Sequence, residues 1–169
     1  MNSPSEYQPK LGHLNNPMQS MTLFPELLEE GYKLRLKVTG VSMAPFIKSG
    51  SYVTLFKIPV LKLRIGDIIF CQCDDGSFKL HRLIRMKNDL LLTKGDALRA
   101  FDPLVDKSGY KGKVVHIENF HFCGMAFQNM NNGSIRLLNF LIAKYQQIKT
   151  YPIFTLIGLR SKPVKSLSS

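Results

Sequence analysis

A serine in an unusual local setting is the first residue in this chain that could do chemistry. Ser42 lies between Gly40 and Pro45, and His81 follows in a later segment. Proline cannot continue a regular helix or a central strand, and glycine favours turns, so the segment around Ser42 is expected to form a loop. A serine in such a loop suits the mouth of a cleft better than a core. The segment therefore predicts that Ser42 is a nucleophile.

The segments that precede this loop must position it. Residues 33–39 alternate polar and apolar side chains without interruption, which is typical of a half-buried strand, and they lead directly into Gly40. Before them, residues 22–30 are expected to form a short helix that Thr22 caps and Gly31 ends. The helix should dock through its apolar face on the strand that follows.

The rest of the chain continues as short β-rich segments separated by turns. These expected strands lie at residues 52–56, 68–73, 78–86, 90–93 and 114–117. The fold class that follows is mainly β, a small antiparallel β domain with a short helix before it and an amphipathic helix after it. We expect a flexible arm over residues 1–21, the β domain over residues 22–120, and a basic helical extension and tail over residues 121–169.

Five motifs in a fixed order strengthen the assignment of a nucleophile. They are Gly40-x-Ser42-Met43-x-Pro45, Gly66-Asp67-Ile68-Ile69, His81-Arg82-Leu83-Ile84, Thr93-Lys94-Gly95-Asp96 followed by Asp102, and Lys111-Gly112-Lys113-Val114-Val115. Together they resemble the S24/S26 serine peptidases, the superfamily that contains signal peptidases and LexA-like self-cleaving repressors. The resemblance covers roughly residues 24–119. It implies the β fold of the signal peptidases and of the LexA C-terminal domain.

The resemblance is nearest to the endoplasmic-reticulum and archaeal type of signal peptidase, which uses histidine as its base. It implies that Ser42 is the nucleophile and His81 the general base, that Asp102 supports the histidine, and that Asp96 is a second acidic site residue. An imidazole with an ordinary pKa of about 6.5 is already a free base at neutral pH, which suits this role.

Several roles remain open on the sequence. Lys79 and Lys94 flank the expected site, and a serine–lysine pair is the alternative to His81. The two aspartates are equally compatible with architectural turns. The other histidines have no motif and are expected to be structural or surface residues; they are His13, His116 and His121.

Position 40 departs from the signal peptidases, which usually carry a serine two residues before the nucleophile. Gly40 has no hydroxyl that could assist an oxyanion, so backbone N–H groups such as that of Ser42 would have to suffice. The repressors cleave their own chain before the serine, whereas the one comparable dipeptide here, Cys123-Gly124, lies after it. We expect cleavage of another polypeptide rather than self-cleavage. The alternative is a catalytically degenerate relative that acts as a peptide-binding or membrane-surface interaction module.

Composition indicates which partners and cofactors to expect. The chain of 169 residues has a formal net charge of +11, and no acidic residue follows Glu118. No nucleic-acid motif accompanies the charge, so we expect a polypeptide partner and no specific nucleic acid. Three cysteines are too few for a disulfide framework and lack the spacing of a zinc site, so we expect free thiols, no metal and no cofactor.

The C-terminal segment offers a second kind of partner. Residues 135–149 are expected to form a helix with a broad apolar stripe and basic flanks, which suits an anionic membrane surface, packing on the β domain or packing on a partner. Neither an N-terminal signal peptide nor a membrane-spanning run is expected. We expect a cytoplasmic protein, with peripheral membrane contact as the alternative, and a flexible tail over residues 161–169.

Overall fold

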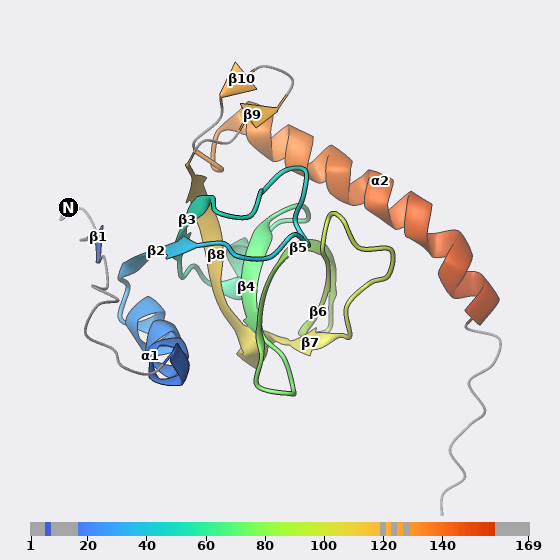
Figure 1. Ribbon diagram of the computed structural model, residues 1–169. Coiled ribbons are helices and arrows are strands. Elements are labelled where there is room, and N and C mark those ends of the chain that lie inside the picture. Colours follow the sequence, from blue (N-terminus) through green and yellow to red (C-terminus); the bar gives the residue numbers. More distant parts are fainter. Residues whose placement is uncertain (1–5, 8–16, 119–120, 123–124, 127–128, 158–169) are drawn as a thin grey trace, which may run out of the picture.

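A curled, mainly antiparallel sheet forms the body of the molecule (Figure 1). The computed structural model describes residues 6–7, 17–118, 121–122, 125–126 and 129–157. The strands of the sheet are β1 (Glu6–Tyr7), β2 (Lys33–Lys37), β3 (Tyr52–Phe56), β4 (Ile68–Gln72), β5 (Phe78–Lys87), β6 (Leu90–Lys94), β7 (Val105–Asp106) and β8 (Tyr110–Ile117). A separate two-stranded ribbon joins β9 (His121–Phe122) to β10 (Met125–Ala126).

The strand order in the sheet is β1-β2-β3-β8-β4-β5-β6-β7. Every neighbouring pair is antiparallel except β1 and β2, which run parallel. The prediction of a mainly β fold with antiparallel strands is confirmed. The short strands β1, β7, β9 and β10 were not predicted, because two residues are too few to show a period.

The β4–β5 and β5–β6 hairpins are closed by turns at the predicted places. Asn88 and Asp89 form the second turn with φ angles of 49° and 65°. Asparagine and aspartate tolerate this left-handed conformation better than other side chains do, which suits a two-residue hairpin turn. Two single-turn 3₁₀ helices, η2 (Val60–Lys62) and η3 (Lys107–Gly109), complete the connections.

The first helix begins earlier than the sequence predicts. Helix α1 spans Pro17–Glu29, so Thr22 lies inside it rather than at its start. Proline at the first helical position costs no hydrogen bond, which suits Pro17. The predicted stop is confirmed: Gly31 has φ +87°, and the N–H of Tyr32 donates to the carbonyl of Leu27 at 3.0 Å, as at a glycine-terminated helix.

Both helices contribute to one hydrophobic core. Phe24 and Leu28 of α1 pack with the inner residues of β2, β3 and β8, and Met130 and Ile135 join the same cluster from the C-terminal segment. Helix α2 spans Gly133–Ile157, longer than the predicted 135–149, and runs along one side of the sheet (Figure 1). Helix α2 is therefore packed on the β domain over residues 135–150.

The ranges expected at the two ends are only partly described. Within the expected arm, Glu6–Tyr7 pairs with β2 and α1 already begins at Pro17. The expected tail over residues 161–169 lies outside the described residues. Within the described part of the chain, no helix is long and apolar enough to cross a membrane.

Candidate active site

The predicted nucleophile and base are in contact. The Oγ atom of Ser42 lies 3.0 Å from Nε2 of His81, and Nδ1 of the same ring lies 2.7 Å from Oδ2 of Asp102. A carboxylate can only accept, so Nδ1 carries the ring proton and Nε2 is left to accept from the serine hydroxyl. The three side chains thus form a continuous chain of hydrogen bonds from the hydroxyl to the carboxylate.

Each of the three residues is held by a different element. Ser42 sits in the loop between β2 and β3, which contains Pro45 and consists of turns, as predicted. Met43 and Ile47 of this loop are fully buried in the core and anchor it. His81 lies in β5 opposite Ile69 of β4, in the interior of the sheet.

Asp102 is placed by the strand that precedes it. Its backbone N–H donates to the carbonyl of Thr93 at 2.9 Å, and the hydroxyl of Thr93 donates to its carboxylate at 2.7 Å. The side chains of His81 and Asp102 are 7% and 8% exposed, so solvent does not loosen their contact. Thr93 therefore fixes the carboxylate that orients the histidine.

The environment of Asp102 favours its ionised form. Burial raises the pKa of Asp102, but hydrogen bonds from His81 and Thr93 and the charge of His81 outweigh it and hold the pKa below its usual range. An ionised Asp102 stabilises an imidazolium beside it, which is the species that forms when His81 takes the serine proton.

Asp96 has a different partner. Both of its oxygens accept from Arg82, at 2.8 Å from Nε and 2.7 Å from Nη2, and the two side chains are almost completely buried. Nη1 of Arg82 also donates to the carbonyl of Gly66 and to the side chain of Asn139. Asp96 thus neutralises a buried guanidinium between the sheet and α2, and Asp102 is the aspartate that contacts the serine–histidine pair.

Lys94, one of the two alternative bases, is also engaged elsewhere. Its Nζ donates to Oε1 of Gln146 and to the carbonyl of Leu98, both at 2.6 Å, and more weakly to the carbonyl of Gly95. Burial lowers the pKa of Lys94, although the nearby carboxylate of Asp96 opposes this. The group that contacts the hydroxyl of Ser42 is His81.

A loop after β6 links Ser42 to α2. The N–H of Ala97 donates to the carbonyl of Ser42 at 2.8 Å, and Gln146 donates to the carbonyl of Asp96 at 3.1 Å. A Cβ on Gly95 would lie 2.8 Å from the carbonyl oxygen of Ser42, so only glycine allows this approach. The position of Ser42 therefore depends on residues 94–98 and on the helix that holds them.

If Ser42 attacks a carbonyl, a donor to the resulting oxyanion can come from the backbone of the serine loop. Within the described part of the chain, the N–H of Ser42 donates no hydrogen bond, which leaves it available to a substrate carbonyl. At Gly40 a Cβ would meet nothing within 4 Å, so no neighbouring group occupies the place of the missing side chain. The donor set lacks the hydroxyl that signal peptidases usually carry there.

No protein-family model and no curated protein matches the chain. Among the described residues, no group of three histidine, cysteine or acidic side chains is arranged to hold a metal ion. Cys71 is buried and Cys73 is partly exposed, and both are free thiols.

The sequence left three supporting residues unidentified. Thr93 lies in a recognised motif, yet its contact with Asp102 needs the register of β6 to be known. Asn139 and Gln146 lie in the predicted helix, and their contacts with Arg82 and Lys94 span more than fifty residues of sequence. Polar residues at helical spacing on an otherwise apolar helix were the available signal.

Proposed function

We propose that this protein is a serine endopeptidase related to signal peptidases of the serine–histidine type. The observation that carries the proposal is the hydrogen-bonded series from Ser42 Oγ through His81 to Asp102. Nucleophile, base and orienting carboxylate in this order are the parts that acyl transfer by serine requires. The motifs in their order and the antiparallel β fold support membership of the S24/S26 superfamily.

The proposed reaction follows from these positions. Ser42 Oγ attacks the carbonyl carbon of the scissile peptide while its proton passes to His81 Nε2, and Asp102 stabilises the imidazolium. The N–H of Ser42 would donate to the oxyanion. His81 then gives its proton to the departing amine, which leaves an acyl-enzyme. A water molecule, deprotonated by the same nitrogen, hydrolyses the ester and restores Ser42.

The substrate class that we propose is a leader or signal-like segment of another polypeptide. Backbone around Ser42 is accessible, since Val41 is 70% exposed and Ser42 itself is partly exposed. In signal peptidases the substrate lies extended beside sheet strands with small side chains at the cut, and we propose the same mode of β-strand addition here.

The decisive experiment is mass spectrometry of a peptide library after incubation with the wild type and with Ser42→Ala and His81→Ala. Ser49→Ala is a matched control, because Ser49 lies in the same loop and its hydroxyl donates to the carbonyl of Thr39 rather than to a catalytic group. His116→Ala is the control histidine. We expect cleavage by the wild type and by both controls, and none by the two active-site variants.

Gly40 favours a second candidate, a relative that binds peptides without cutting them. The same experiment separates the two. Peptides retained by the wild type but never cleaved would support the binding module. Cleavage that persists in Ser42→Ala would exclude the serine mechanism.

A further inference from the structure

Helix α2 packs on the sheet with its polar side. The residues that it buries recur at helical spacing and are mostly polar or small; they are Ile135, Asn139, Ala143, Gln146 and Thr150. Their amides make specific contacts: Asn139 accepts from Arg82, and Gln146 accepts from Lys94. The oxygens of both amides and the N–H₂ group of Gln146 are bonded within the protein, so this side of α2 faces the sheet.

The opposite side of α2 is apolar and faces outward. Its side chains and their exposed fractions are Leu137 60%, Phe140 40%, Leu141 55%, Tyr145 61% and Ile148 74%. At 100° per residue, the centre of this set lies opposite the buried set. Soluble helices normally do the reverse and turn their apolar stripe to the core. An exposed apolar face of this kind marks an interaction surface.

Basic side chains accompany this face. Lys144 lies over the ring of Phe140 at 5.6 Å, and Lys149 lies over the ring of Tyr145 at 5.8 Å. No acidic residue occurs anywhere in the sequence from residue 119 to residue 169. The exposed side of α2 therefore combines apolar side chains with positive charge. A partner that complements it must carry both apolar groups and negative charge.

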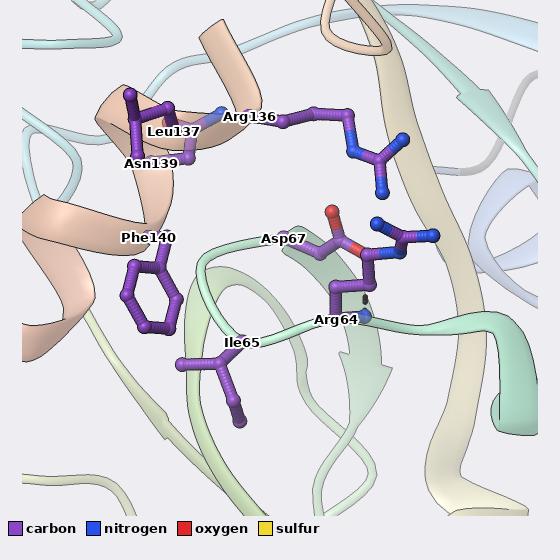
Figure 2. A pocket seen from close by; sticks show the side chains of 7 residues that line it. All are labelled: Arg64, Ile65, Asp67, Arg136, Leu137, Asn139 and Phe140. Atoms are coloured by element: carbon purple, nitrogen blue, oxygen red, sulfur yellow. Dashed lines mark hydrogen bonds between the residues drawn. The ribbon is translucent and has the colours of Figure 1, made fainter. Parts of the chain in front are cut away.

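A cavity of about 450 Å³ beside the start of α2 adds two more cations (Figure 2). Arg64 and Arg136 line it, and Figure 2 shows their guanidinium groups extending to the same side of it, beside Asp67. The carboxylate of Asp67 is already used, because it accepts from Nζ of Lys113 at 2.7 Å and from the backbone N–H of Arg64 at 2.9 Å. The two guanidinium groups leave the cavity with an excess of positive charge.

Apolar residues join this cavity to the outward face. Leu137 and Phe140 line it and also belong to the exposed side of α2. Guanidinium groups bind phosphate through paired N–H donors, while neighbouring apolar side chains suit acyl chains. A phosphate next to hydrocarbon is the composition of a lipid headgroup region.

We propose that the outward face of α2, with the Arg64–Arg136 cavity at one end, docks on an anionic phospholipid bilayer. The helix lies in the interface with its apolar side in the membrane and its polar side on the catalytic sheet. A second copy of the chain fits less well: a twofold contact would bring Lys144 and its neighbours against the same positive groups, in a protein whose net charge is +11.

The test is co-sedimentation with vesicles of phosphatidylcholine, with and without phosphatidylglycerol. We expect the wild type to bind the anionic vesicles and to stay in solution with the neutral ones. Each basic residue at a membrane surface is worth about a fivefold change in partitioning, so Arg64→Gln/Arg136→Gln should bind about 25-fold more weakly. Leu141→Gln/Ile148→Gln removes apolar contact and should weaken binding at least about tenfold.

The matched control is Lys37→Gln/Lys107→Gln, which removes the same charge from residues away from α2. Lys37 ends β2 and Lys107 begins η3, so neither belongs to α2 or lines the cavity. This control should change binding less than about threefold. Equal binding of the wild type to both vesicle types, or binding to neither, would overturn the proposal. So would a soluble dimer that Leu141→Gln/Ile148→Gln dissociates, because the occupant would then be a second copy.

Discussion

The same substitution at two aspartates should have opposite consequences. Asp96→Asn should lower stability and spare the reactivity of Ser42, whereas Asp102→Asn should abolish reactivity with a smaller loss of stability. The reason is that Asp96 neutralises Arg82, whereas Asp102 orients His81. Both carboxylates are buried, so exposure does not distinguish them.

The stability effect follows from the burial of the ion pair. The side chains of Arg82 and Asp96 are 0% and 1% exposed. Removing one partner of such a pair costs about 3–5 kcal/mol, because it leaves a buried charge uncompensated. An amide at position 96 keeps one acceptor oxygen, so we expect the lower end, about 3 kcal/mol. For a chain of this size that corresponds to a fall in Tm of about 6–12 °C.

The reactivity effect follows from the tautomer of His81. An amide in place of Asp102 presents an N–H₂ group as well as an oxygen, and it cannot stabilise an imidazolium by charge. The rate should fall by on the order of 10³–10⁴. Loss of one hydrogen bond from His81 or Thr93 should cost about 1–2 kcal/mol of stability, less than at position 96.

The assay is the rate at which a fluorophosphonate probe labels Ser42, paired with Tm from calorimetry. Labelling reports activation of the hydroxyl and needs no knowledge of the substrate. Asp89→Asn is the matched control, because Asp89 pairs with Lys107 at the surface and should change the stability by less than about 1 kcal/mol. Wild-type labelling by Asp102→Asn, or a wild-type Tm with lost labelling in Asp96→Asn, would refute the division of roles.

Three further outcomes are expected. Gly66→Ala should lower the free energy of unfolding by about 1–3 kcal/mol more than Gly76→Ala does, as measured by denaturant titration. Both residues have positive φ, but a Cβ on Gly66 would lie 2.6 Å from the backbone of α2, whereas a Cβ on Gly76 would meet nothing within 4 Å. Equal losses would mean that α2 can move away from position 66 without cost. Burial raises the pKa of the Cys71 thiol to about 12, so iodoacetamide should label Cys73 first and Cys71 only when the protein unfolds. Peptide mapping after alkylation measures both. Equal labelling of the two cysteines in the folded protein would contradict the burial of Cys71. The pKa of Asp102 is lower in the folded protein than in the unfolded chain, so the stability that its ionised carboxylate contributes is fully present above the ordinary aspartate pKa of about 3.9 and is lost as the pH falls through the lower folded value. The difference in the free energy of unfolding between the wild type and Asp102→Asn should therefore narrow as the pH is lowered below that ordinary value. A constant difference would argue against the lowered pKa.

Much of the sheet could be predicted because its strands carry local signals. The alternation of residues 33–39 and the turn residues around position 88 identify β2 and the β5–β6 hairpin from their own composition. Strand order could not be predicted. Strand β8 lies between β3 and β4, far from either in sequence, and nothing local in the chain indicates that insertion.

The candidate site also has a part that local sequence predicts and a part that it does not. Ser42 and His81 were identified by motifs, and the structure brings them into contact at 3.0 Å. The separate tasks of the two aspartates could not be predicted, because a carboxylate six residues from another has the same local signal. Which of them reaches the histidine depends on how residues 95–104 return to β6, and this path is set by long-range packing.

The contact between Ala97 and Ser42 makes the position of the Ser42 hydroxyl depend on α2, which lies far from the serine loop in sequence. Residues 94–98 contact the serine loop on one side and Gln146 of α2 on the other, so a displacement of α2 would also displace Ser42. A chain shortened before α2 could keep its sheet and still lose the alignment of Ser42 with His81. In this protein a helix synthesised after the whole sheet supports the serine that the first strands position.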